Sequence, residues 1–268
     1  MARGTYIDIP EGQIHYRTEG SGETVILLHQ TPLSSCEYAD MIPILARNYG
    51  VLAIDTPGYG NSFKPLGQYE IEDYARCLIG FMDALKIEKA NVVGDHTGAS
   101  IAVEAAAGYP DRLDKLVLCG CPYYEPEERE AKLTDPRFIP MEIKEDGSHL
   151  MKIWGIPKSF APHSTPESWH RMVVDYLVAG VHAINAWHAV FRYDVKPRLP
   201  LIKCRTLLIS GSEDLFLDRL ETTANFIPRC RTKVIEGGGD VIAYERFGAF
   251  ADAILEFFKN PEEFLEND

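Results

Sequence analysis

The residues best suited to chemistry lie at a glycine-flanked turn, Gly94-Asp95-His96-Thr97-Gly98. The apolar run Ala90 to Val93 before it predicts a buried strand, and the small residues after it predict a helix that ends near Gly108. A strand, a sharp turn and a helix, with glycine on each side of the apex, is the layout that presents a nucleophile at a sheet edge. The apex here is His96, whose imidazole can exchange a proton near neutral pH.

Two later loops supply carboxylates that could act with this histidine. Asp214 follows the apolar run Arg205 to Ser210, and Asp240 follows the run Thr232 to Ile235. Each run predicts a parallel strand, and the carboxyl ends of such strands meet at one edge of the sheet. A carboxylate bonded to His96 would raise the imidazole pKa and orient the ring, which makes His96 a candidate general base or acid. The sequence leaves open which aspartate does this.

Backbone N–H groups near the same edge could stabilise a negative charge on a reacting oxygen. Thr97 lies at the start of the helix that follows the turn, and Gln30 and Thr31 lie in the loop after the predicted strand Thr24 to Leu28. The N–H of Thr97, together with that of Gln30 or Thr31, would form an oxyanion hole.

The alternation of predicted strands and helices indicates how these loops are positioned. A hairpin over residues 5–18 comes first, and strands at 24–28, 51–55, 90–94, 115–119, 205–210 and 232–235 follow. Between them we expect helices over about 37–48, 71–86, 99–108 and 215–226, with a terminal helix over 244–259. This order predicts an α/β fold with a mostly parallel twisted sheet and helices on both faces.

Residues 122–199 break this order, because they hold many prolines and acidic residues and no convincing strand. We expect a core of residues 1–121 and 200–268, with 122–199 inserted as a helical lid. The candidate pocket residues are Trp154, Trp187 and Phe191 in this insertion and His29 in the core. Alternatively, His29 could have a purely structural role and donate a hydrogen bond that holds its own loop. No metal site is expected, because the lid histidines lack ligand spacing on one helix face.

Composition limits the partners. The 268-residue chain has 27 Lys and Arg against 40 Asp and Glu, a net charge of −13, which argues against nucleic acid and anionic membranes as partners. No long apolar run predicts a membrane span or a secretory signal, so a cytoplasmic location is expected. The expected partner is a small-molecule substrate, no cofactor is implied, and a homodimer stays open.

Four motifs, in this order along the chain, resemble those of the α/β-hydrolase superfamily. They are LLHQTP (Leu27 to Pro32), DTPGYGNS (Asp55 to Ser62), GDHTG at the turn and SGSED (Ser210 to Asp214). The resemblance implies an esterase, lactonase, C–C hydrolase, epoxide hydrolase or dehalogenase type of enzyme. Two positions depart from its pattern: the nucleophile position holds His96, and Asp240 lies where triad enzymes usually carry the catalytic histidine.

The sequence therefore predicts an enzyme that acts on a small, mostly apolar ester, lactone or enolisable ketone. Its acid-base group would be His96, oriented by Asp214 or Asp240, without an acyl-enzyme on serine. Two alternatives stay open. One is a lyase, decarboxylase or cyclase of secondary metabolism, and the other is a ligand-binding protein without catalytic activity.

Overall fold

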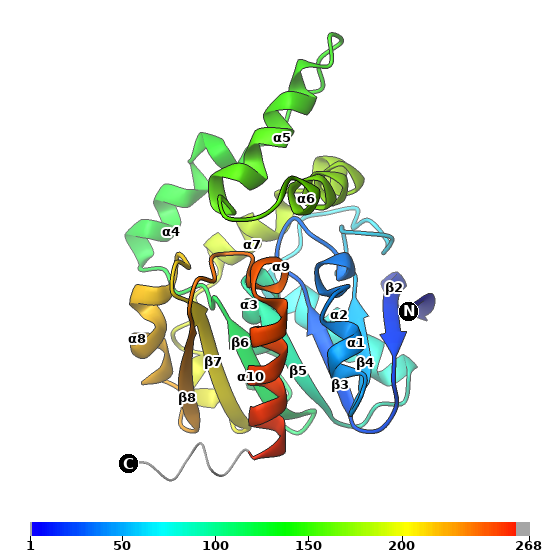
Figure 1. Ribbon diagram of the computed structural model, residues 1–268, viewed down its shortest axis with the longest axis vertical. Helices are drawn as coiled ribbons and strands as arrows, with labels where there is room; N and C mark the ends of the chain where they lie inside the picture. Colours follow the sequence, from blue (N-terminus) through cyan, green and yellow to red (C-terminus); the bar gives the residue numbers. More distant parts are fainter. Residues whose placement is uncertain (1, 261–268) are drawn as a thin grey trace.

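One twisted eight-stranded sheet organises the protein in a computed structural model that describes residues 2–260 (Figure 1). The strands are β1 (Arg3–Ile9), β2 (Gly12–Glu19), β3 (Thr24–Leu28), β4 (Gly50–Ile54), β5 (Ala90–Asp95), β6 (Leu113–Cys119), β7 (Arg205–Gly211) and β8 (Cys230–Ile235). Their order across the sheet is β1-β2-β4-β3-β5-β6-β7-β8. The pairs β1-β2 and β2-β4 are antiparallel, and all the others are parallel.

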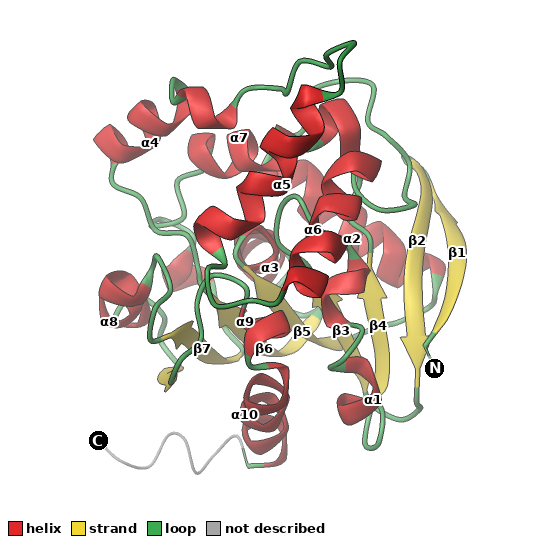
Figure 2. Cartoon of the chain, turned by 45° about the horizontal axis from the view of Figure 1, so that its top comes forward, coloured by secondary structure: helices red, strands yellow, loops and turns green. Residues whose placement is uncertain are grey.

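Helices cover both faces of this sheet (Figure 2). The α-helices are α1 (Ile42–Leu45), α2 (Ile71–Ala84), α3 (Thr97–Gly108), α4 (Pro126–Leu133), α5 (Ser148–Phe160), α6 (Pro166–Ala179), α7 (Asn185–Arg192), α8 (Leu220–Ala224), α9 (Ile242–Glu245) and α10 (Phe247–Lys259). Side chains alternate along β3: Ile26 and Leu28 pack in the core with α2 and α3, whereas Val25 and Leu27 pack in the core with α1 and α10.

The predicted fold class is confirmed, because a mostly parallel sheet lies between two helical layers. Every residue of β5 is buried, as expected for a central parallel strand. The strands therefore read as continuous apolar runs, and this is why they could be recognised in the sequence.

Some helix boundaries differ from those expected. The helix expected over 37–48 is instead a 3-10 turn, η1 (Ser35–Tyr38), followed by the one-turn helix α1, with Pro43 in its first turn. The terminal helix is also divided, because α9 ends at Glu245 and α10 begins at Phe247. These short turns redirect the chain as it leaves the sheet edge.

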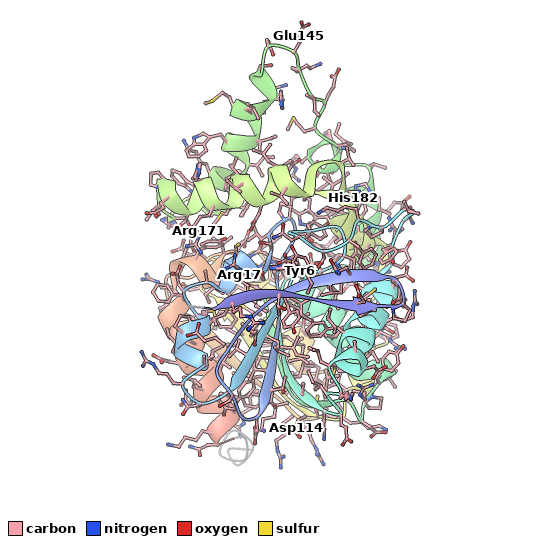
Figure 3. The ribbon with its side chains drawn as sticks, turned by 90° about the vertical axis from the view of Figure 1, so that its right-hand side faces the viewer. Tyr6, Arg17, Asp114, Glu145, Arg171 and His182 are labelled. Carbon is pink, nitrogen blue, oxygen red and sulfur yellow. The ribbon has the colours of Figure 1, made fainter. Side chains whose placement is uncertain are left out.

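The segment between β6 and β7 holds α4 to α7 and no strand (Figure 1). Its outer tip, near Glu145, lies at the opposite end of the molecule from Asp114, which is at the start of β6 (Figure 3). The inserted helices therefore lie toward the carboxyl ends of the strands. We call residues 122–199 the helical insertion.

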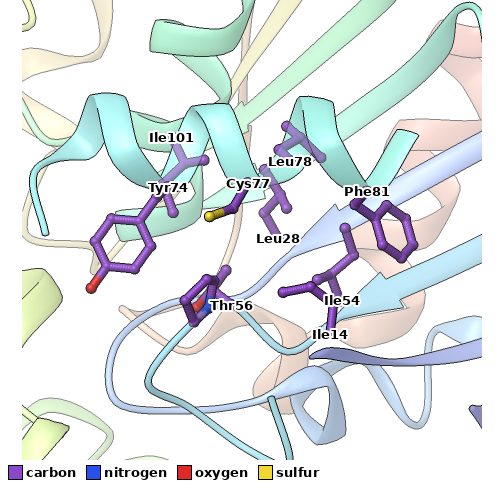
Figure 4. A pocket seen from close by; sticks show the side chains of 10 residues that line it. Ile14, Leu28, Ile54, Thr56, Tyr74, Cys77, Leu78, Phe81 and Ile101 are labelled. Atoms are coloured by element: carbon purple, nitrogen blue, oxygen red, sulfur yellow. The ribbon is translucent and has the colours of Figure 1, made fainter. Parts of the chain in front are cut away.

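A cavity of about 10 Å³ lies within the core between the sheet and α2 (Figure 4). It is lined by Ile14, Leu28, Ile54, Thr56, Pro57, Tyr74, Cys77, Leu78, Phe81 and Ile101. This volume holds about one water molecule, and no charged side chain lines it, so we assign it no chemistry. Within residues 2–260, none of the helices combines the length and apolar character needed to cross a membrane.

Candidate active site

His96 occupies the apex of a strained turn between β5 and α3. Its backbone has φ 46° and ψ −107°, outside the regions that residues other than glycine usually adopt. A Cβ on Gly94 would lie 2.3 Å from the carbonyl oxygen of Gly98, and a Cβ on Gly98 would lie 2.0 Å from that of Leu28. Only glycine fits at both positions, so the spacing in the sequence reflects close backbone packing.

The imidazole ring of His96 is held by a carboxylate from the loop after β7. Its Nε2 lies 3.0 Å from Oδ2 of Asp214, and the exposed fractions of the two side chains are 14% and 1%. The other oxygen of Asp214 accepts the backbone N–H of Phe216 at 2.7 Å. Asp214, rather than Asp240, is therefore the residue that orients the ring in this structure.

The charge on His96 follows from these neighbours. Burial alone would lower its pKa, but the charge and hydrogen bond of Asp214, with smaller effects from Asp95 and Asp240, raise the pKa to about 10. The ring is therefore an imidazolium at neutral pH. Its Nε2–H donates to Asp214, which leaves Nδ1–H without a partner among the described residues.

Asp240 lies beside this pair but makes a different hydrogen bond. Its Oδ1 accepts the backbone N–H of Leu215 at 2.8 Å. Burial raises its pKa, the nearby charge of His96 opposes this rise, and Asp214 adds to it. One side-chain atom from each of His96, Asp214 and Asp240 lies within 4.8 Å of the others, so these three are also the residues in the described chain that could hold a metal ion.

Of the predicted oxyanion donors, Gln30 is already engaged. Its backbone N–H donates to Glu37 at 3.0 Å, and its side-chain amide donates to Glu37 and to the carbonyl oxygen of Asp240. The N–H groups of Thr31 and Thr97 donate to no other described residue. Of the two alternatives left open, Thr31 is therefore the available donor beside Thr97.

His29, predicted as a pocket residue, is buried in the structure with an exposed fraction of 1%. The backbone N–H of Thr56 donates to Nε2 at 3.0 Å, so Nδ1 carries the proton and donates to the carbonyl oxygen of Gln30 at 2.9 Å. Burial lowers its pKa and keeps the ring neutral. His29 holds two loops together, which is the alternative that the sequence left open.

Aromatic side chains lead from His96 into the helical insertion. The successive ring pairs are His96–Phe216 at 5.6 Å, Phe216–Tyr124 at 5.2 Å, Tyr124–Phe191 at 5.9 Å, Phe191–Phe138 at 4.8 Å and Phe138–Trp187 at 5.2 Å between centroids. We call these five aromatic residues beyond His96 the aromatic row. The row contains Trp187 and Phe191, two of the residues predicted to line the pocket. The third, Trp154, is not part of it, and Lys158 lies over its ring.

Sequence reasoning missed Phe216 and Tyr124, the residues of the row nearest His96. It also assigned no role to Asp95, which ends β5, or to Glu37, whose carboxylate holds Gln30. Asp95 has no exposed surface, and neither of its oxygens has a hydrogen-bond partner in the described chain. Its position directly before the apex, at the end of a mostly apolar strand, was the available signal.

The comparisons with known proteins agree with this architecture. Residues 23–247 match the model of the α/β-hydrolase fold family. A 2-hydroxy-6-oxo-6-phenylhexa-2,4-dienoate hydrolase from Burkholderia cepacia is 30% identical over 280 aligned positions, which cover 92% of each chain. A 2-hydroxy-6-oxononadienedioate/2-hydroxy-6-oxononatrienedioate hydrolase from Comamonas testosteroni is 29% identical, also over 92% of each chain.

Among solved structures, the enol-lactonase from Burkholderia xenovorans LB400 is similar, with a TM-score of 0.76 and 25% sequence identity. The alignment covers 95% of this chain and 100% of the enol-lactonase. The matched family model spans most of the chain, including the strained turn and the loops that carry Asp214 and Asp240. The chain therefore belongs to the α/β-hydrolase fold family.

Proposed function

We propose that this protein is a hydrolase that adds water to the carbonyl group of a small, mostly apolar ester or lactone. The observation that carries the proposal is the His96 ring, held at the strained apex by the 3.0 Å hydrogen bond to Asp214. The relatives named as hydrolases and the similar enol-lactonase support carbonyl chemistry of this kind.

In the proposed mechanism His96 acts as the acid. Its imidazolium form keeps Nε2–H on Asp214 and offers Nδ1–H to the carbonyl oxygen of the substrate. The free N–H groups of Thr97 and Thr31 would hold the same oxygen as it becomes negative. A donor of this kind typically contributes about 3 kcal/mol to lowering the barrier.

The proposed base is Asp240, whose second oxygen accepts no hydrogen bond from the described residues. It would take a proton from water while the water oxygen bonds to the carbonyl carbon. His96 would then give a proton to the leaving oxygen as the bond from carbon to that oxygen breaks. The proton on Asp240 returns to His96, so one water is consumed and both groups are restored.

The aromatic row would bind the apolar part of the substrate, with Phe216 nearest the reacting atoms. Its outer members, Phe138, Trp187 and Phe191, belong to the helical insertion, which would close over the substrate as a lid. An acyl-enzyme on serine is not supported. Ser100 is completely buried on α3, and the hydroxyl of Ser34 donates to Asp175 rather than to a histidine.

A second candidate is a lyase-type reaction, in which the same groups move a proton next to a carbonyl without adding water. It is favoured by Asp240, a carboxylate at the position where triad enzymes usually carry histidine. Hydrolysis in ¹⁸O-labelled water distinguishes the two. A hydrolase places ¹⁸O in the acid product, whereas a lyase leaves both products unlabelled.

Kinetics of His96→Ala test the proposal on a panel of p-nitrophenyl esters and lactones. We expect kcat/KM to fall by roughly 10² to 10⁴, the usual contribution of a positioned acid. The matched control is His163→Ala, because His163 is an exposed histidine paired with Glu213 on the surface. Equal turnover by wild type and His96→Ala would remove the proposed mechanism.

A further inference from the structure

One lysine lies over the aromatic row without an acidic partner. Lys132 belongs to α4, which packs beside α7 in the helical insertion (Figure 2). Its Nζ lies 5.7 Å from the ring centroid of Tyr124 and 5.5 Å from that of Phe138, and both rings belong to the row. Within residues 2–260, this ammonium group makes no ion pair with a carboxylate.

The carboxylates that act on Lys132 are bound to other cations. Burial lowers the pKa of Lys132 and the charge of Arg137 lowers it further, whereas Asp135 and Glu128 raise it. One oxygen of Glu128 accepts a hydrogen bond from Arg219 at 3.1 Å, and the other accepts the backbone N–H just before α4 at 2.8 Å. Both oxygens of Asp135 accept hydrogen bonds from the guanidinium group of Arg137. Lys132 is therefore a half-buried cation that is available to an anion from outside the chain.

The two ends of this path differ in charge. At the inner end, the ring of Phe216 lies 5.6 Å from that of His96, beside the carboxylates of Asp214 and Asp240. These carboxylates disfavour another anion close to the reacting atoms. Lys132 lies farther out, over the ring that follows Phe216 in the row. An anionic group on a substrate would therefore be favoured at the outer position.

We propose that Lys132 binds a carboxylate at the outer end of the substrate, so that the preferred substrate has an apolar chain that ends in a carboxylate remote from the reacting carbonyl. The inference names the substrate class of the proposed active site, and in that respect it rests on the proposed function. The ammonium group would donate a charge-assisted hydrogen bond to the carboxylate. The faces of Tyr124 and Phe138 would hold the ammonium group in place.

Steady-state kinetics on matched pairs of p-nitrophenyl esters test the inference. One member of each pair is the mono-p-nitrophenyl ester of adipic, suberic or sebacic acid, and the other carries a neutral amide in place of the terminal acid. In wild type, kcat/KM should be roughly tenfold higher for the acid than for the amide at one or more of these chain lengths. The ratio should fall toward one in Lys132→Met and be retained in Lys132→Arg, which keeps the charge.

Lys158→Met is the matched control. Nζ of Lys158 lies 5.5 Å and 5.1 Å from the ring centroids of Trp154 and Trp169, and neither ring belongs to the aromatic row. This variant should keep the wild-type ratio. The ratio compares two substrates on one protein, so a general loss of activity in Lys132→Met would not change it. A wild-type ratio of one or less at every chain length, or an unchanged ratio in Lys132→Met, would overturn the proposal.

Isothermal titration calorimetry separates failure of this inference from failure of the proposed function, because binding needs no turnover. The ligands are 4-phenylbutanoate and its neutral amide. Wild type should bind the acid roughly tenfold more tightly than the amide, and Lys132→Met should bind both about equally. If wild type hydrolyses none of the esters but shows this binding preference, the proposed function fails and the role of Lys132 stands. Equal affinities in wild type, or no detectable binding of the acid, would overturn that role.

Discussion

At the scale of single residues, the hydrogen bond between His96 and Asp214 favours the protonated form of the imidazole, the form that the proposed mechanism uses. Both groups are largely buried, so their interaction is screened less than a surface ion pair would be. A histidine with an ordinary pKa would be mostly neutral at pH 7.5, whereas His96 carries a proton up to about pH 10. Of the two roles expected for the ring, base or acid, this difference favours the acid role in the proposed mechanism.

Asp214→Asn should therefore move the alkaline limb of the pH profile of kcat/KM to lower pH. If His96 works as an acid, activity falls as pH rises through the pKa of His96, about 10 in wild type. Without the charge of Asp214 the pKa of His96 is lower, and the fall in activity should begin at a lower pH than in wild type. Asp218→Asn alters an exposed carboxylate near the same loop and should leave the limb in place. An unmoved limb in Asp214→Asn would show that Asp214 does not set the charge on the ring.

The sequence predicted the apex and two candidate aspartates, but neither the choice between them nor the protonation of the ring. Glycine spacing reveals the turn, since Gly94 and Gly98 are required by backbone contacts that only such a turn makes. The pKa of His96 depends instead on burial and on the charge and hydrogen bond of Asp214, which spacing does not report. The sequence suggested only that the imidazole exchanges a proton near neutral pH, whereas its surroundings in the structure raise its pKa to about 10.

At the scale of elements, the turn after β6 must leave room for the site. Gly120 has φ +52°, and a Cβ there would lie 2.4 Å from Nε2 of His96 and 2.9 Å from Oδ2 of Asp214. Gly120→Ala should therefore separate the two groups and lower kcat/KM more than tenfold. Steady-state kinetics with a Tm measurement check this.

Gly155→Ala is the matched control for that substitution. Gly155 lies within α5, and nothing approaches its ideal Cβ position within 4 Å. Alanine should stabilise this helix by about 0.5 to 1 kcal/mol and leave kcat/KM unchanged. Equal activities of the two variants would contradict the close packing inferred at Gly120.

The loop after β4 depends on one buried carboxylate. Burial would raise the pKa of Asp55, but hydrogen bonds from His15, Ser35 and Asn61 lower it to about 2. The shift corresponds to about 2 kcal/mol. Asp55→Asn should lower the free energy of unfolding at pH 7 by about this amount, as measured by urea denaturation. A loss below about 0.5 kcal/mol would contradict the role assigned to these bonds.

The helices and strands predicted from the sequence agree with the structure where a helix has one apolar face or a strand is apolar throughout. The individual helices of the helical insertion could not be predicted in this way. The sequence predicted that residues 122–199 are helical but placed no helix at α5, whose Gly155 and Pro157 are poor helix formers. Pro157 lies in the last turn of α5, and packing of Ile153 against the core compensates for these residues. Such tertiary contacts are not visible in local sequence.

At the scale of the whole molecule, the buried titrating groups set how stability changes with pH. The pKa of His96 is raised from 6.5, so its contribution is complete below pH 6.5 and is lost as pH rises through about 10. The pKa of Asp55 is lowered from 3.8, so its contribution is lost as pH falls toward 2. Asp95 and Asp175 have raised pKa values, so their ionisation costs stability as pH rises from about 4 to 7.

We therefore expect the free energy of unfolding to be greatest in weakly acidic solution and to fall as the pH rises, with the contribution of His96 lost between about pH 6.5 and 10. Urea denaturation across this range measures it. In His96→Gln the part of this fall that His96 causes, between about pH 6.5 and 10, should be absent, because no imidazolium is lost. Parallel curves for wild type and His96→Gln would show that the ring does not carry the raised pKa.

The most direct test of the central claim is a ¹⁵N NMR titration of the His96 ring in the wild-type protein, assigned by comparison with His96→Gln. The structure predicts an imidazolium with both nitrogens protonated at pH 7.5 and a midpoint near pH 10. A ring that is neutral at pH 7.5, with a midpoint near 6.5, would contradict the proposed acid role and the effect assigned to Asp214.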